Sequence, residues 1–376
     1  MAPSTTKQWT VQAKDGFDSL KFHDNADIPP LGDHDVLVNF HYTSLNYRDL
    51  IIPKVPYHTI PLFFSLKNPT HLSLQGKYPF PTAIPVVPGS DGAGTIVAAG
   101  PRVSRFHKGD RVLTLFNQSH LAGSITAADT ATGLGGSLDG TLRQYGAFDE
   151  SGLVLMPSTL DFQQGSTLPC AALTAWNGLY GVEGKSLKPG DTVLTQGSGG
   201  VSMFALQFAK AAGARVISTT SSDAKAEVLK KLGADHIINY KTDKNWGETA
   251  KKLTPGGFGC AHVLEVGGPV TMAQSLKAIR PEGIISIIGF LGGFSKDQPS
   301  FLDCLNNVCT VRGVLVGSRQ QFEQMNAAID ANGIKPVVDD KVFSLEKTKE
   351  AYQYMWDQKH FGKLTIKIDD PSQSKL

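Results

Sequence analysis

The sequence Thr192-Val-Leu-Thr-Gln-Gly-Ser-Gly-Gly-Val-Ser202, followed directly by Met203-Phe-Ala-Leu-Gln-Phe-Ala-Lys-Ala-Ala212, contains a short apolar run, a glycine-rich turn and a helix-forming segment. This order predicts a β-strand that leads through a tight turn into an α-helix. Glycines in such a turn let the backbone approach a pyrophosphate, and the N–H groups at the start of the helix point at that anion. The stretch therefore predicts a dinucleotide-binding turn formed by Gly197, Ser198, Gly199, Gly200 and Val201.

The same alternation of strand and helix continues along the chain beyond this turn. Between Asp191 and Gly313 we expect strands at 192–195, 215–219, 236–238, 261–266, 283–288 and 310–315, and helices at 200–212, 223–232, 245–253 and 269–279. Strands that alternate with helices of this length predict a doubly wound parallel sheet of the Rossmann type. We therefore expect an α/β fold in which residues 158–315 form the dinucleotide-binding domain.

The rest of the chain predicts a second, β-rich domain. Residues 1–157 contain short runs of strand composition, such as 36–42 and 94–99, separated by glycine-containing turns. Residues 316–376 contain two helical stretches and a final strand at 362–368. We expect residues 1–157 and 316–376 together to form the substrate-binding, catalytic domain.

Composition excludes several classes of protein. The 376 residues are 41% hydrophobic and 19% charged, which suits a chain with buried cores. A net charge of +2 gives no argument for binding to nucleic acid or to a membrane surface. No apolar run approaches the roughly 20 residues that span a bilayer. The polar N-terminus predicts no signal peptide, and the cysteines have no zinc-finger spacing, so we expect reduced thiols in an intracellular protein.

The chain ends in Ser374-Lys375-Leu376. These three residues match a peroxisomal import signal, which a receptor reads at the carboxyl end of the chain. They predict a peroxisomal location, with the cytoplasm as the alternative, and they say nothing about chemistry.

Several motifs occur in a fixed order along the chain: Pro88-Gly-Ser-Asp-Gly-Ala-Gly94, Gly109-Asp-Arg-Val112, Leu168-Pro-Cys-Ala-Ala-Leu-Thr-Ala-Trp176, the glycine turn, Leu232-Gly-Ala-Asp-His-Ile-Ile-Asn-Tyr240, Val266-Gly-Gly268 and Gly362-Lys363. With these motifs the chain resembles the medium-chain dehydrogenase/reductase superfamily, which includes zinc alcohol dehydrogenases, quinone oxidoreductases and enoyl reductases. The resemblance covers nearly the whole chain. It implies that the β-rich domain is GroES-like and that the protein is a homodimer.

The chain departs from the zinc-dependent members at their metal ligands. In those members a Cys stands near the position of Asn46, and Gly-His-Glu stands where this chain has Gly89-Ser90-Asp91. Amide and hydroxyl groups are poor zinc ligands, and Cys170, which matches a further ligand position, cannot hold a catalytic zinc alone. We therefore expect no metal, as in the zinc-independent quinone oxidoreductase and enoyl reductase branch.

The residues after the second predicted strand favour NADPH over NADH. A NAD site typically carries a carboxylate at that strand end, where this chain has Thr220, Ser221 and Ser222, followed by Lys225. Hydroxyls and a lysine can bind a 2′-phosphate, although the serines also suit a helix N-cap and Lys225 a solvated charge. The resemblance adds Tyr240, aligned with a tyrosine that covers this phosphate, and further cofactor contacts at Thr174, Gly267, Gly289, Phe290 and Lys363.

Without zinc, hydrogen-bond donors must polarise the substrate. Tyr78, in Gln75-Gly-Lys-Tyr-Pro79, resembles the proton-donating tyrosine of enoyl thioester reductases, and Asn46 and Tyr47 are further catalytic candidates. The long apolar, proline-rich segment 51–77 could form a lid or wall of the binding site, or it could pack on its own domain or at a subunit interface.

These residues predict NADPH-dependent reduction of an activated C=C bond in a small-molecule substrate, by hydride transfer. The substrate class would be an enone, a quinone or an enoyl thioester. Two alternatives stay open: carbonyl or alcohol redox chemistry at a zinc-free site, and NADPH binding without catalysis.

Overall fold

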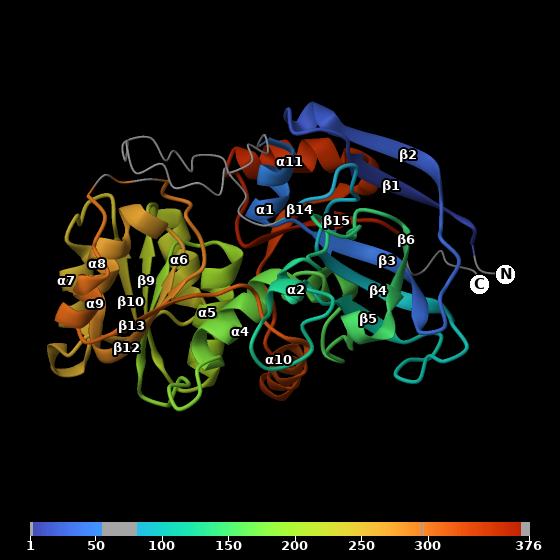
Figure 1. The fold of residues 1–376 in the computed structure, drawn as a ribbon. Coiled ribbons are helices and arrows are strands. Elements are labelled where there is room, and N and C mark those ends of the chain that lie inside the picture. Colours follow the sequence, from blue (N-terminus) through green and yellow to red (C-terminus); the bar gives the residue numbers. More distant parts are fainter. Residues whose placement is uncertain (1–2, 55–80, 294, 296, 370–376) are drawn as a thin grey trace, which may run out of the picture. The chain divides into compact units, whose positions relative to one another are not determined.

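The computed structural model describes residues 3–54, 81–293, 295 and 297–369 (Figure 1). The chain forms two compact units: residues 1–156, 340–360 and 364–376 in the first, and 157–339 and 361–363 in the second. The boundary near residue 157 lies where the sequence predicts it. The later boundary does not, because residues 316–339 belong to the second, nucleotide-binding unit and not to the β-rich one.

Helix α10 (Arg319–Asn332) explains this difference. The side-chain amide of Asn177 donates to the carbonyl oxygen of Val316 at 2.7 Å, just before the helix. At its other end, the Asp330 carboxylate accepts bonds from the backbone amides of Ser158 and Thr159, each at 3.0 Å. These contacts tie α10 to the second unit, a long-range pairing that the local sequence pattern does not encode.

The sheet of the second unit is doubly wound. Its strands are β8 (Thr192–Gln196), β9 (Arg215–Thr220), β10 (His236–Asn239), β11 (Cys260–Glu265), β12 (Ile279–Ile287) and β13 (Thr310–Gly313). Their order is β10-β9-β8-β11-β12-β13, and every neighbouring pair is parallel. This order is that of two mononucleotide-binding halves joined at β8, which confirms the predicted Rossmann-type fold.

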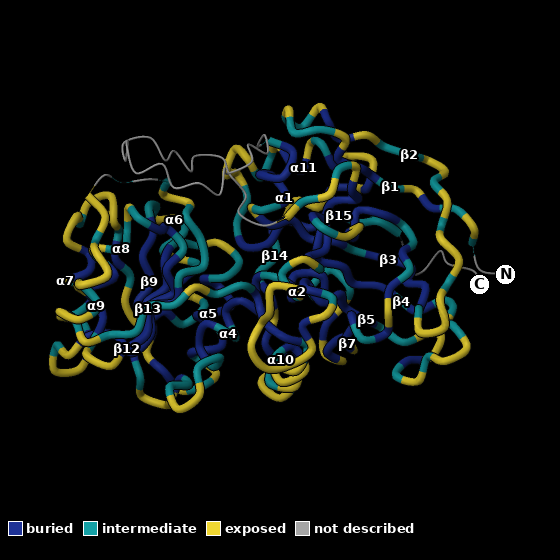
Figure 2. Tube along the Cα trace, in the orientation of Figure 1, coloured by how far each residue is buried: buried dark blue, intermediate teal, exposed yellow. Residues whose placement is uncertain are grey.

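The second unit has eight α-helices within the described residues, and four of them, α5 to α8, lie where the alternating pattern predicts helices. They are α3 (Phe162–Gly165), α4 (Leu173–Tyr180), α5 (Gly200–Ala211), α6 (Asp223–Lys231), α7 (Trp246–Leu253), α8 (Met272–Ala278), α9 (Leu302–Asn306) and α10. Leu194, Ile217, Val263 and Ile285 of the central strands are buried with Trp246 of α7 in one apolar core. In Figure 2 the central strands form the buried layer, and exposed residues lie on the surrounding helices and loops.

The first unit is built on antiparallel strands. The strands β1 (Thr5–Val11) and β2 (Leu20–Asp27) form a two-stranded sheet. A larger sheet has the order β14 (Val338–Ser344), β15 (Lys363–Lys367), β3 (Asp35–Ser44), β4 (Asp91–Ala99), β5 (Arg111–Thr114) and β7 (Leu153–Leu155), with β6 (Tyr145–Asp149) also paired to β3. Its helices are α1 (Tyr47–Ile51), α2 (Ala127–Thr130) and α11 (Thr348–Trp356). This is the β-rich domain that the sequence predicts.

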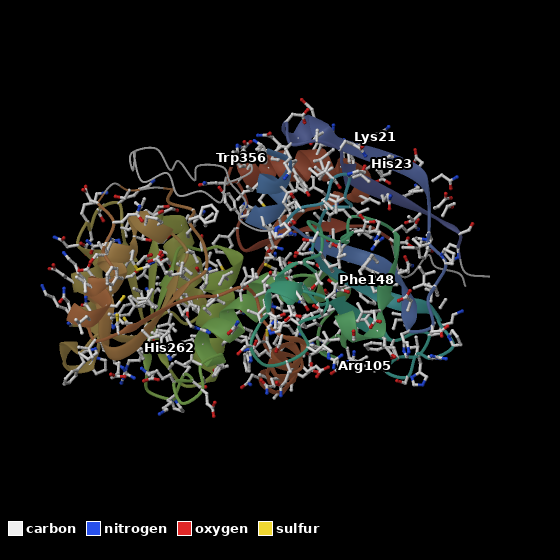
Figure 3. All side chains as sticks on the ribbon, in the orientation of Figure 1. Lys21, His23, Arg105, Phe148, His262 and Trp356 are labelled. Carbon is white, nitrogen blue, oxygen red and sulfur yellow. The ribbon has the colours of Figure 1, made fainter. Side chains whose placement is uncertain are left out.

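Two apolar clusters hold the first unit together. Phe40 of β3 and Phe148 of β6 meet edge to face with ring centroids 5.6 Å apart. Figure 3 labels Phe148. Trp9, Tyr352 and Leu364 belong to a second cluster that joins the two ends of the chain. Full burial of such a side chain contributes about 1.5–3 kcal/mol, which explains why residues 364–369 return to this unit. Within the described ranges no helix is long and apolar enough to cross a membrane.

Candidate nucleotide and substrate site

The glycine turn after β8 has the geometry that a bound pyrophosphate requires. Gly197 has φ +74°, in the left-handed region that favours glycine. Gly199 is the N-cap of α5, and a Cβ atom added at Gly197 or Gly199 would meet no atom within 4 Å. Since Gly199 has no side chain to cap the helix, the first backbone amides of α5 remain available to an anion. The predicted residues 197–201 therefore form a turn that fits a dinucleotide.

Lys363 packs directly against this turn, although it lies far away in the sequence. Gly199 forms an isolated parallel bridge with Gly362. A Cβ added at Gly200 would lie 2.7 Å from the Cδ atom of Lys363 and 3.2 Å from the Cβ atom of Ala171. The Lys363 side chain is buried, with 3% exposure. The structure thus places Lys363, a predicted cofactor contact, beside the predicted contacts Gly199 and Gly200.

The predicted 2′-phosphate residues gather at the end of β9. The backbone amide of Tyr240 donates to the carbonyl oxygen of Thr220 at 3.0 Å, which places Tyr240 beside the strand end. Ser222 caps helix α6, and its hydroxyl accepts from the amide of Lys225 at 3.4 Å. Ser222 therefore has the helix-capping role that its position in the sequence suggests. β9 itself ends at Thr220, a hydroxyl residue, and the nearby carboxylate of Asp223 is exposed in the first turn of α6.

A buried carboxylate that the sequence analysis missed holds the turn after β11. Glu265 is fully buried, and its Oε1 atom accepts bonds from the amides of Gly267 at 2.9 Å and Gly268 at 2.8 Å. The hydroxyl of Thr271 donates to the same oxygen at 2.5 Å. These bonds fix the backbone at Gly267, a predicted cofactor contact.

The second oxygen of Glu265 links the turn to β8. Its Oε2 atom accepts from the Nε2 atom of Gln196 at 2.8 Å and from the hydroxyl of Ser275. The Oε1 atom of Gln196 in turn accepts from the amides of Val266 and Gly267, each at 3.2 Å. This network joins the carboxyl ends of two neighbouring strands. The sequence signal that could have revealed it is a carboxylate directly before the Val266-Gly-Gly268 motif.

The loops after β11 and β12 are hydrogen-bonded to each other. The amides of Leu291 and Gly292 donate to the carbonyl oxygens of Val266 and Gly267, at 3.1 and 2.9 Å. The predicted contacts Gly267, Gly289 and Phe290 therefore lie on two paired loops at the carboxyl edge of the sheet.

Thr174 lies elsewhere in the same unit, in the first turn of α4, and is buried with 3% exposure. A π-helical turn, Leu168–Ala172, which contains Cys170, precedes it. Such turns occur frequently at functional sites. They are not visible in sequence patterns, and this one was not predicted.

In the first unit, Asn46 and Ser90 contact each other. Asn46 is the N-cap of α1, and its backbone amide donates to the Asp49 carboxylate at 2.8 Å. Its side-chain Nδ2 atom donates to the hydroxyl of Ser90 at 3.4 Å, and that hydroxyl donates to the Asp91 carboxylate at 3.0 Å. Tyr47 follows at the start of α1 with 40% exposure, and partial burial raises its pKa.

Asp49 anchors α1 through an ion pair. Its carboxylate is fully buried and lies 3.3 Å from the guanidinium of Arg48, which also donates to the carbonyl oxygen of Leu134 at 2.7 Å. The guanidinium stacks over the ring of Phe116. These contacts position the start of α1, and with it Asn46 and Tyr47.

Three predicted features lie outside the described residues: Tyr78, the segment 55–77 and the C-terminal Ser374, Lys375 and Leu376. Among residues 3–54, 81–293, 295 and 297–369, no three His, Cys, Asp or Glu side chains gather in a group that could hold a metal ion. The metal-free site stays a prediction.

Two protein families match the two units. Residues 32–158 match the alcohol dehydrogenase GroES-like domain, and residues 200–331 match the zinc-binding dehydrogenase family. The first match confirms the GroES-like character predicted for the β-rich domain.

Known proteins resemble the chain over its whole length. A zinc-type alcohol dehydrogenase-like protein of Schizosaccharomyces pombe is 46% identical, over 94% of this chain and 96% of its own. A quinone oxidoreductase of Homo sapiens is 26% identical, over 90% of each chain. A crystal structure from Sinorhizobium meliloti 1021, provisionally named an alcohol dehydrogenase, has 37% identity and a TM-score of 0.82, over 98% of this chain and 100% of its own. The chain therefore belongs to the medium-chain dehydrogenase/reductase superfamily and is an oxidoreductase of that superfamily.

Proposed function

We propose that the protein is a zinc-independent, NADPH-dependent reductase of an activated C=C bond, in an enone, a quinone or an enoyl thioester. The observation that carries this proposal is the hydrogen bond between Asn46 and Ser90. These residues stand where zinc-dependent members of the superfamily have Cys and His. An amide and a hydroxyl that bind each other are poor zinc ligands, so polarisation of the substrate falls to hydrogen-bond donors.

The residues present fit a nicotinamide dinucleotide, which when bound supplies the hydride. The open space at Gly197 and Gly199 and the uncapped start of α5 suit its pyrophosphate. After hydride reaches the β-carbon of an activated alkene, charge develops on the carbonyl oxygen and the α-carbon needs a proton. The hydroxyl of Tyr47, whose pKa is raised by burial, stays protonated at neutral pH and is suited to donate to that oxygen. Tyr78 remains the proposed proton donor to carbon.

The end of β9 supports NADPH as the cofactor. Thr220, Ser222, Lys225 and Tyr240 lie together there, and the strand ends in a hydroxyl residue instead of a carboxylate. Hydroxyl donors and a cation suit a 2′-phosphate, whereas a carboxylate would suit the free ribose hydroxyls.

The names of relatives support reduction of C=C bonds or quinones. Besides the human quinone oxidoreductase, a 2-methylene-furan-3-one reductase of Solanum lycopersicum is 27% identical over 97% of this chain and 79% of its own. The compound in that name is an enone.

A panel of enones, quinones and enoyl thioesters tests the proposal, with NADPH oxidation as the signal. We expect turnover of at least one class with NADPH, and much weaker turnover with NADH. Turnover of no panel member would contradict the proposal.

Substituting Tyr78→Phe should lower kcat by about 100-fold or more if the phenol donates the proton, and leave the Kd for NADPH unchanged. Tyr354→Phe is the control, because it removes a hydroxyl in α11 that donates to the carbonyl oxygen of Lys359 and is not among the proposed site residues. An undiminished rate in Tyr78→Phe would rule out Tyr78 as the donor.

Carbonyl or alcohol redox chemistry is the second candidate, since the Schizosaccharomyces pombe relative is named as zinc-type alcohol dehydrogenase-like. Product analysis with an enone separates the two: C=C reduction yields the saturated ketone, and C=O reduction yields the allylic alcohol. Tight NADPH binding without turnover of any compound would favour the third alternative, a protein that binds the cofactor without catalysis.

We also propose peroxisomal import through Ser374, Lys375 and Leu376. A fluorescent fusion that keeps this carboxyl end free should enter peroxisomes, and removal of the three residues should leave it in the cytoplasm. An unchanged distribution after their removal would contradict the proposal.

A further inference from the structure

Helix α9 ends in a Schellman motif immediately before the edge strand β13. The amide of Cys309 donates to the carbonyl oxygen of Cys304 at 3.1 Å, and the amide of Val308 donates to that of Leu305 at 3.1 Å. Val308 has φ +49°, the left-handed conformation that this motif requires at the residue after the helix cap. Glycine usually occupies that position, so the chain forms this turn at some cost in backbone energy.

The motif brings two cysteines together. The residues joined by its longer hydrogen bond, here Cys304 and Cys309, are those whose side chains ordinarily touch. Given the 3.1 Å between the amide nitrogen of Cys309 and the carbonyl oxygen of Cys304, bond lengths limit the separation of their Cα atoms to at most about 7 Å. Disulfides form at Cα separations of about 4.4–6.8 Å. Burial, with a smaller contribution from the neighbouring Cys304 thiol, raises the pKa of Cys309.

The pair differs from the other cysteines in its surroundings. Both Cys304 and Cys309 are half-buried, so a small oxidant can reach them. Cys260 is fully buried in β11, and burial raises its pKa to about 12, which makes it unreactive. Cys170 is half-buried on a different segment.

We propose that Cys304 and Cys309 are a redox-active dithiol that closes to a reversible intramolecular disulfide when the protein meets a peroxide. The Cys304 thiolate attacks one oxygen of hydrogen peroxide, the O–O bond breaks, and a sulfenic acid and hydroxide form. The sulfur of Cys309 then attacks the sulfenic sulfur, giving the S–S bond and a second hydroxide, while the thiol proton of Cys309 ends on water. In sum, two thiols and one peroxide give one disulfide and two waters, and a dithiol reductant reverses the reaction.

The disulfide would cross-link a turn that two backbone hydrogen bonds already stabilise. β13 is the edge strand of the six-stranded sheet, and Cys309 also packs against the apolar core of that unit. Oxidation therefore locks the connection between α9 and β13, at the left of Figure 1, without rearranging the sheet. This inference does not depend on the proposed substrate or cofactor.

Mass spectrometry of the full-length, reduced protein tests the proposal. Hydrogen peroxide is added, free thiols are alkylated with iodoacetamide, and the protein is digested with trypsin. Both cysteines fall in one peptide, Asp297–Arg312. We expect this peptide to lose both alkyl groups and to be about 2 Da lighter than its dithiol form, with full return after dithiothreitol. Closure should speed up about tenfold from pH 7 to pH 8, because Cys309 must lose its proton to attack.

Two variants and one control complete the test. In Cys309→Ser the closure is blocked and a sulfenic acid on Cys304 should be trapped by dimedone, whereas in Cys304→Ser neither product should form. Cys170→Ser should close as the unchanged protein does. Recovery of the peptide with both thiols alkylated while Cys170 is oxidised would overturn the proposal. So would a disulfide between two chains on a non-reducing gel, or irreversible sulfinic acid at either cysteine without closure.

Discussion

Glu265 is a buried carboxylate whose hydrogen-bond partners are all uncharged. Five donors reach its two oxygens, from Gly267, Gly268, Thr271, Gln196 and Ser275. Hydrogen bonds to a charged acceptor contribute about 1.5–3 kcal/mol each, and a buried donor left without a partner costs a similar amount. A single side chain therefore sets the conformation of the turn that contains Gly267.

The substitution Glu265→Gln should destabilise the protein by about 2–4 kcal/mol. The new amide turns a donor toward groups that are themselves donors, and leaves at least one of them unsatisfied. We also expect NADPH binding to weaken several-fold, because Gly267 loses its fixed position. Glu282→Gln is the control, since Glu282 is an exposed partner of Lys185 and its substitution should leave stability nearly unchanged. Urea unfolding and NADPH titration measure both effects, and equal stabilities for the two variants would contradict this role.

Ser221 lies in the hydroxyl-rich segment after β9 and should set the choice of cofactor. Ser221→Asp places a carboxylate where a 2′-phosphate would bind, so like-charge repulsion should weaken NADPH binding about 10–100-fold, while NADH binding holds or improves. Ser221→Ala removes only a hydroxyl and should weaken NADPH several-fold without a gain for NADH. Titration of both variants with NADPH and with NADH measures these changes in affinity. Unchanged NADPH affinity in Ser221→Asp would place the phosphate elsewhere.

At the scale of the element, two neighbouring glycines in the turn between β8 and α5 should have different roles. Gly199 should matter for cofactor binding, and Gly200 for the stability of the fold. A Cβ atom at Gly199 meets open space, whereas one at Gly200 would crowd Lys363 and Ala171. Gly199→Ala should therefore keep its stability to within about 0.5 kcal/mol and lose NADPH affinity by more than about tenfold, since the methyl group enters the space of the pyrophosphate. Gly200→Ala should lose about 1–3 kcal/mol of stability. Thermal unfolding and titration of both variants test this, and a reversed order of stabilities would contradict it.

The strands and helices of the nucleotide-binding unit could be predicted because their signals are local. Alternating apolar runs and amphipathic segments gave every strand of the sheet to within a few residues. β12 begins at Ile279, earlier than the predicted residue 283, because Ile279 pairs with Cys260 across a register shift. The sequence pattern did not predict a strand at residues 279–282, because Pro281 and Gly283 are typical of loops. Helix α1, whose capping box is formed by Asn46 and Asp49, was not predicted.

Residue patterns alone predicted parts of the site only where the residues are neighbours in sequence, whereas distant residues such as Lys363 and Tyr240 were predicted through the resemblance to the superfamily. The turn at 197–201 and the segment at 220–225 were recognised from spacing. The bond between Asn46 and Ser90, the network around Glu265 and the packing of α10 depend on residues far apart in the chain, which only the folded structure brings together.

At the scale of the whole molecule, a histidine in the core should make stability depend on pH. Burial lowers the pKa of His262, labelled in Figure 3, to about 4; Asp191 opposes this shift, and Arg280 and Arg312 add to it. Between about pH 6.5 and 4 the unfolded chain binds a proton that the folded chain does not. Stability from this residue is therefore complete above about pH 6.5 and is lost as the pH falls toward 4, by about 3 kcal/mol in total.

The variant His262→Leu isolates this contribution. Urea unfolding at pH 7 and at pH 4.5 should show a smaller loss of stability on acidification for the variant than for the unchanged protein. Equal losses in both would show that other groups, such as the carboxylates, carry the acid sensitivity.

The central claim is that the protein reduces an activated C=C bond with NADPH and without zinc. The most direct test is to react one enone with NADPH before and after exhaustive treatment with a chelator, with the zinc content measured on the same sample and the product identified. We expect the saturated ketone, formed at the same rate before and after the treatment. An allylic alcohol, or a rate that the chelator abolishes and added zinc restores, would contradict it and favour the alcohol dehydrogenase alternative.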